Sequence, residues 1–214
     1  MMVKLTIVGR LNDGLPLSQG PIYANDDDVT TIFKQHAEFL LHEISTAALP
    51  PSATTIFHHH HCFNYMVRNG ICFITLCDAS YPTKLAFHYL QDLQKEFDKV
   101  DRESVEHVTE PYSFVEFDKV ICNIIRQYID TRTQANLLKL NANHKQQLNV
   151  HTEQMSMVFE RRRKSDLLER MMRAHKSTSP VWGSNTLPVI AVKWIPITIV
   201  FVVAFVLLGS SLAV

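Results

Sequence analysis

The first 130 residues predict an α+β domain, in which helices cover one or both faces of a mainly antiparallel sheet. Two observations support this expectation: strand-like runs are separated by turn signals, and three further segments repeat apolar residues every three or four positions. A third observation extends it, because a long polar segment and then a long uncharged segment follow the domain. We therefore expect one folded head, one long helix and one membrane-spanning helix.

Two hairpins are expected in the sheet. The run VKLTIVGRL is rich in β-branched residues and stops at Asn12, Asp13 and Gly14, a tight-turn signal, after which LPLSQ can return as a strand. The runs FNYMV and ICFITLC flank Asn69 and Gly70, and an Asn-Gly pair accepts the positive φ angles of a two-residue hairpin loop. A further strand can precede this second hairpin.

Three amphipathic helices are expected around the sheet. The first follows the acidic stretch from Asn25 to Asp28, and negative charge is favourable at a helix N-terminus. Each helix is predicted from apolar residues that share one face. These are Val29, Phe33, Leu40 and Ile44 in the first helix, Ala86, Leu90, Leu93, Phe97 and Val100 in the second, and Phe114, Phe117, Ile121, Ile124 and Tyr128 in the third.

The remainder of the chain changes character twice. Residues 131–179 are polar, contain no proline or glycine, and can form one helix, whereas residues 180–193 hold two prolines and a glycine and are typical of a linker. Residues 194–214 carry no charge and are long enough, at about 1.5 Å per residue, to cross a hydrocarbon core of roughly 30 Å. Lys193 and Trp194 are expected at the membrane interface. A buried helix or a C-terminal strand is the alternative, which the length and uniformity of the run disfavour.

Composition and motifs exclude several classes of function. The formal net charge is zero, so nucleic acid is not favoured as a partner. The sequence has no GxSxG, no Walker-type glycine loop, no GxGxxG and no HExxH, so we expect no enzyme, no cofactor and no small-molecule substrate. The four cysteines form no CxxC pair and are expected to be reduced, mostly buried thiols of a cytosolic protein.

A run of four histidines, His58 to His61, stands beside Cys62 and suggests a metal site. Neighbouring residues of a strand point to opposite faces, and no second pair of ligands with zinc-site spacing is visible. An exposed polar strand or loop is therefore the favoured interpretation, and no metal is expected.

Five stretches, in this order, resemble the longin-type R-SNAREs of ER–Golgi vesicle transport, most closely their plant form: VKLTIVGRLNDGLPL, CDASYPTKLAFHYLQDLQKEF, PYSFVEFDKVI, YIDTRTQANLLKLN and VKWIPITIVFVVAFVLL. The resemblance is strong over residues 2–141 and in the last segment. It implies a longin domain at 1–130, a SNARE coiled-coil motif at 131–179, a linker at 180–193 and a tail anchor at 194–214. It also implies single-pass insertion in endoplasmic reticulum and Golgi membranes, with the N-terminal region in the cytosol.

In this family the SNARE motif enters a parallel four-helix bundle with three Q-SNARE helices, and the assembly docks and fuses vesicles. The stretch VFERRRKSDLL resembles the centre of the motif, with Arg161 as the central-layer arginine facing three glutamines. A guanidinium suits that place because it offers five donors to three amide oxygens. A solvated helix face is the open alternative for Arg161. The candidate apolar layers are Leu137, Leu140, Val158, Leu168 and Met172.

The predicted motif is degenerate. Counting by threes and fours from Arg161, seven of the twelve other layers are polar, and each missing buried leucine removes on the order of 1.5–3 kcal/mol. Pro180 ends the helix before the motif of the family would end. Residues 161–176 hold seven Lys or Arg and two Asp or Glu, an excess that can attract an anionic leaflet or remain a solvated face. These departures suggest a diverged paralogue.

They also leave a second hypothesis of a different class. In it, the chain is a non-fusogenic longin adaptor or decoy, which binds coat, tether or SNARE partners without driving fusion. The number of apolar layers and the helix break at Pro180 are the features that separate the two hypotheses.

Overall fold

The computed structural model describes residues 2–23, 27–129 and 149–177. Its chain divides into two compact units, Met1–Phe159 and Glu160–Val214, and we call the first of these the head. All six strands of the sheet belong to the head. The last helix begins in the head and continues into the second unit.

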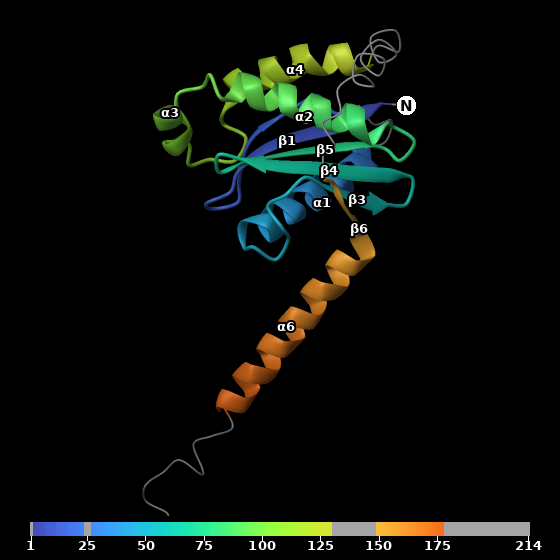
Figure 1. Cartoon of the computed structure of the whole chain (residues 1–214). Helices are drawn as coiled ribbons and strands as arrows, with labels where there is room; N and C mark the ends of the chain where they lie inside the picture. Colours follow the sequence, from blue (N-terminus) through green and yellow to red (C-terminus); the bar gives the residue numbers. More distant parts are fainter. Residues whose placement is uncertain (1, 24–26, 130–148, 178–214) are drawn as a thin grey trace, which may run out of the picture. The chain divides into compact units, whose positions relative to one another are not determined.

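The head contains one six-stranded sheet with the strand order β2-β1-β5-β4-β3-β6 (Figure 1). Neighbouring strands are antiparallel except for β3 and β6, which are parallel. The sheet is mainly antiparallel, as the sequence predicted, and the parallel strand β6 from the polar segment was not predicted. The strands are β1 (Val3–Arg10), β2 (Leu15–Gln19), β3 (Thr54–His58), β4 (His61–Arg68), β5 (Ile71–Asp78) and β6 (His151–Gln154).

The turn chemistry that the sequence predicted is present in the hairpins. Asn69 and Gly70 join β4 to β5 with φ angles of 52° and 79°, the paired positive values that a two-residue loop of this kind needs. Gly14, in the turn between β1 and β2, also has a positive φ of 69°. Both predicted hairpins are confirmed, and β3 is the further strand that precedes the second one.

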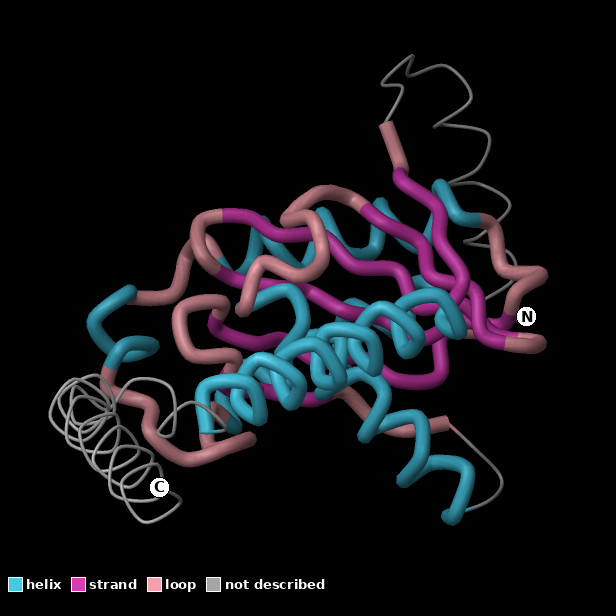
Figure 2. The backbone as a smooth tube through the Cα atoms, turned by 90° about the horizontal axis from the view of Figure 1, so that it is seen from below, coloured by secondary structure: helices cyan, strands magenta, loops and turns pink. Residues whose placement is uncertain are grey.

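Helices cover both faces of the sheet, as Figure 2 shows from below. Helix α1 packs on one face, while α2 and α4 pack on the other (Figure 1). The three predicted amphipathic helices are confirmed, and the short α3 was not predicted. The helices are α1 (Asp27–Ser45), α2 (Thr83–Phe97), α3 (Arg102–Glu106), α4 (Val115–Ile129) and α6 (Met155–Ser177).

Strand β5 separates two hydrophobic clusters. Seven of its eight residues are buried, because it lies in the middle of the sheet with helices on both sides. Alternate side chains point to opposite faces, so Ile74 and Leu76 join the cluster under α1, and Phe73 and Cys77 join the cluster under α2 and α4. The continuous apolar run ICFITLC is explained by this double burial.

The cysteines agree with the sequence-based expectation. All four are free thiols, and Cys62, Cys72 and Cys77 are buried while Cys122 is partly exposed. Burial raises the pKa of each of the three buried thiols, so they remain protonated at neutral pH.

The long polar segment is not one continuous helix. Residues His151–Gln154 form β6, and α6 begins only at Met155. The reason is a tertiary one: the edge of β3 offers main-chain partners to this stretch. Among the described residues no helix is long and apolar enough to cross a membrane, and the predicted span at 194–214 lies outside them.

The close packing of α1 on β1 gives a test of the head. A methyl group added at Gly9 would lie 2.7 Å from one terminal carbon of Leu41 and closer still to the other, and Leu41 is fully buried. We predict that Gly9→Ala destabilises the head by about 1–3 kcal/mol, as overpacking does, in urea unfolding of the full chain. In a Leu41→Ala background the same change should have a smaller effect, and equal effects in both backgrounds would contradict the contact.

Candidate functional site

A short strand from the predicted SNARE motif is added to the edge of the sheet of the head. Residues His151 to Gln154 pair in parallel with Thr54 to Phe57, and the N–H of His151 donates to the carbonyl of Ala53 at 2.9 Å. The pairing uses main-chain groups, and three of the four side chains of β6 are exposed. A polar segment can occupy this edge because the ladder places few demands on its side chains.

The first turn of α6 then packs into the core under α1. Met155 and Val158, three residues apart and so on one helix face, are 0% and 1% exposed. Both belong to the hydrophobic cluster that includes Leu40 and Leu41 of α1 and Ile56 of β3. Burial of two such side chains contributes on the order of 1.5–3 kcal/mol each. We call residues 151–159 the docked segment.

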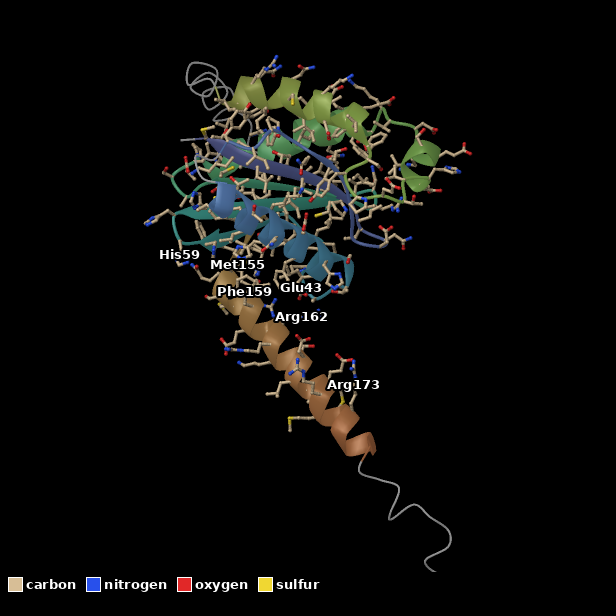
Figure 3. All side chains as sticks on the ribbon, turned by 180° about the vertical axis from the view of Figure 1, so that it is seen from behind. Glu43, His59, Met155, Phe159, Arg162 and Arg173 are labelled. Atoms are coloured by element: carbon tan, nitrogen blue, oxygen red, sulfur yellow. The ribbon has the colours of Figure 1, made fainter. Side chains whose placement is uncertain are left out.

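Phe159 completes the docked segment with aromatic contacts. Its ring centroid lies 5.2 Å from that of Phe39 and 5.3 Å from that of His36, both on α1. The His36 ring in turn meets His58, at the end of β3, with centroids 4.9 Å apart and the rings almost perpendicular. Figure 3 shows Met155, Phe159 and His59 at the same end of the head.

Beyond Phe159, α6 carries an exposed apolar stripe. Leu167, Leu168, Met171 and Met172 are 57–61% exposed, at positions that share one side of the helix. The helix is supported along its polar sides by ion pairs spaced four residues apart. These are Arg162 with Asp166 at 3.1 Å, Lys164 with Glu160 at 2.8 Å, and Arg173 with Glu169.

The structure distributes the predicted site residues among different environments. Val158 is buried in the head, whereas Arg161, Leu168 and Met172 are exposed on α6. Leu137, Leu140, Lys193 and Trp194 lie outside the described residues. The central-layer role of Arg161 and the layer roles of the leucines therefore remain predictions.

Several residues of the site were missed by the sequence analysis. Met155 and Phe159 were missed, although with the predicted Val158 they have the spacing of one helix face, and this i, i+3, i+4 pattern could have indicated a packed turn. Leu167 and Met171 stand one position before the predicted layers and widen the exposed stripe. No local signal in His151 to Gln154 indicated a strand.

The histidine run is partly engaged in packing. His59 and His60 are exposed in the turn between β3 and β4, and His59 has a positive φ of 52°. His58 and His61 are half-buried, and the His61 ring lies 4.7 Å from that of Phe33. In the described part of the chain, no group of three or more His, Cys, Asp or Glu side chains is placed to hold a metal ion.

A hollow of about 640 Å³ lies beside the turns of the two hairpins. Three arginines and three carboxylates line it, and Asp13 is already bound by Arg10, which lowers the pKa of that carboxyl group. Arg10 also donates to the carbonyls of Val105 and Val108. Because its positive and negative side chains are equal in number, the hollow favours neither anionic nor cationic ligands.

Comparison with known proteins assigns the fold and the family. Residues 22–121 match the family model "Longin: Regulated-SNARE-like domain". The chain is 33% identical over 210 residues to the 25.3 kDa vesicle transport protein SEC22-1 of Arabidopsis thaliana, with 96% of each chain covered. It is 36% identical over 176 residues to the protein transport protein sec22 of Schizosaccharomyces pombe, covering 79% of this chain and 77% of the relative.

A third relative, the vesicle-trafficking protein SEC22b-B of Danio rerio, is 36% identical over 143 residues, which is 65% of each chain. The class defined by the fold is thus the longin domain, here with part of the following helix docked on it. The chain belongs to the SEC22 family of longin-domain vesicle-transport proteins.

The docking can be tested with two neighbouring substitutions. Val158→Asp would place a carboxylate in an apolar cluster, so we predict release of the docked segment and amide hydrogen exchange at 151–154 that is faster by about 10²-fold or more. Met157→Asp is the matched control, because Met157 is 56% exposed on the same turn. Equal exchange in the two variants would contradict docking through Val158.

Proposed function

We propose that this protein is an R-SNARE of vesicle transport between the endoplasmic reticulum and the Golgi, as its family membership supports. Residues 131–179 would contribute one helix to a four-helix bundle with three Q-SNARE helices. The work would come from coupled folding and binding of this segment rather than from catalysis. The observation that carries the proposal is the exposed apolar stripe of α6, which presents Leu168 and Met172 beside Arg161 on one continuous helix.

In the proposed bundle, Arg161 occupies the central layer. It follows the buried Val158 by three residues and precedes Leu168 by seven, which is the alternating spacing of layers in a coiled coil. Its side chain is exposed on α6. One arginine against three glutamines would fix the register, because every shifted alignment leaves a buried polar group unpaired.

The docked segment and the bundle would use the same residues. Counting back from Arg161 by threes and fours places predicted layers at Val158, Gln154 and His151. Layers must be helical, whereas His151 to Gln154 form a strand on β3 and Val158 is buried in the head. The docked state supports a model in which the head competes with the partner helices for this segment. Assembly would then require release of β6 from β3 and unpacking of the first turn of α6.

The remaining domain assignments complete the proposal. The longin domain would occupy residues 1–130, the linker 180–193 and the tail anchor 194–214, with Lys193 and Trp194 at the interface. The chain would pass once through the membrane, with the head in the cytosol. The uncharged run of 21 residues is the feature that supports the anchor.

The bundle can be tested by thermal unfolding. We predict that the full chain in detergent micelles, mixed with three candidate Q-SNARE helices, gives a complex that melts cooperatively. Arg161→Ala should lower its melting temperature by several degrees, because loss of one partner leaves buried amides unpaired at about 1–3 kcal/mol. Arg163→Ala, an exposed arginine on the same helix, is the control and should leave the melt unchanged.

Failure to form any complex while the head stays folded would contradict the R-SNARE proposal. That result would leave the longin adaptor or decoy, which binds partners through the head alone. Equal effects of Arg161→Ala and Arg163→Ala would instead remove Arg161 from the central layer while keeping the bundle.

A further inference from the structure

Two histidines from different elements meet at the docked segment. His36 of α1 contacts both Phe159 and His58, and the His58 ring also meets His59, with centroids 4.6 Å apart. We call His36 and His58 the histidine pair. Because Phe159 is the last residue of the docked segment, the pair lies where a change of charge acts directly on docking.

The environment of the histidine pair favours the neutral form of both imidazole rings. The Nδ1 atom of His36 is buried and has no hydrogen-bond partner among the described residues. A neutral ring can present a bare lone pair there, whereas a protonated ring would place a charged N–H donor at that buried position without an acceptor. Burial lowers the pKa of His36, and the neighbouring His58 lowers it further. Burial also lowers the pKa of His58, with His59 as the second cause.

The other ionisable groups around the pair do not compensate a positive charge. His59 and His60 lie in the exposed turn, and His61 contacts Lys4, with 2.9 Å between Nε2 and Nζ, and Asp78, with 3.8 Å between Nε2 and Oδ1. On α1, Lys34 lies over the ring of Tyr112 and Glu38 accepts a hydrogen bond from Tyr112, so both are engaged elsewhere.

Helix α6 contributes no charge to the contact within the head. Its residues there, Met155 to Phe159, include no ionisable side chain. The strand β6 of the docked segment adds the exposed His151 and the buried Glu153, and neither is among the causes of the lowered pKa of His36 or His58. No carboxylate of the described residues shifts the pKa of His36 or His58.

We propose that the histidine pair is a proton-operated latch on the docked segment: with both rings neutral the segment stays docked, and protonation of the pair releases it. The proposed function matters to the latch in one respect only: the residues that the latch releases are those that would enter the bundle. The release itself is a property of this chain alone.

The sign of the pH dependence follows from the direction of both shifts. Each pKa is lower than the ordinary histidine value of about 6.5, and loss of the Phe159 contact on release would remove part of the burial that lowers the pKa of His36. Docking is therefore at full strength above about pH 6.5 and weakens as the pH falls below it. Below that value, release gains up to about tenfold per pH unit if one ring takes up a proton and up to about a hundredfold if both do.

The test is amide hydrogen exchange of the full chain in detergent micelles at pH 7.5, 6.5 and 5.5, corrected for the intrinsic pH dependence of exchange. Protection of residues 151–154 should fall between pH 7.5 and 5.5, by up to about tenfold if one ring takes up a proton and by more if both do, while protection in β5 stays constant. In His36→Phe, which keeps an aromatic ring but cannot titrate, the fall should be several-fold smaller. His42→Phe, at an exposed histidine of the same helix, should behave as the wild type.

A pH-independent protection in the wild type, or an unchanged fall in His36→Phe, would overturn the latch. If His36→Phe loses protection in β5 and so fails to fold, NMR titration of the wild type decides. The His36 ring should then titrate below pH 6.5 and move upward in Phe159→Ala, and an ordinary value in both would overturn the proposal. No partner helix is present in these experiments, so the latch and the bundle can fail independently.

Discussion

The parallel main-chain ladder between β3 and β6 is the interaction on which the arrangement of the site depends. It gives the edge of the sheet a partner, and it sets Met155 and Val158 over the cluster under α1. The ladder needs little from the side chains of β6. Polar residues such as His151 and Gln154, which would weaken a bundle layer, are therefore acceptable as an edge strand.

This difference in side-chain demands gives the degenerate motif a physical meaning. A four-helix bundle gains stability from each apolar layer, and seven of the twelve predicted non-central layers are polar. The docked state retains the buried Met155 and Val158 and adds the contact of Phe159 with α1. In the proposed account, a bundle with few apolar layers would have to exceed these contacts, so we expect the docked state to be the resting one and the charge of the histidine pair to shift the equilibrium.

Local signals predicted the local parts of the fold. Asn69 and Gly70 specify their turn through backbone conformation alone, and α1, α2 and α4 follow from apolar periodicity. The strand β6 could not be predicted, because HTEQ has no strand pattern and is extended only through the edge of β3. The contact of His36 with Phe159 joins residues far apart in the sequence, and the roles of Arg161 and of residues 194–214 stay predictions.

The central claim is that the segment cannot be docked and bundled at once. Amide hydrogen exchange of the full chain, with and without three Q-SNARE helices, tests it most directly at β3. If the account is correct, residues 54–58 become less protected when the complex forms, because β6 leaves their edge, while β5 is unchanged. Undiminished protection of β3 in an assembled complex would show that the two states coexist and would contradict the account.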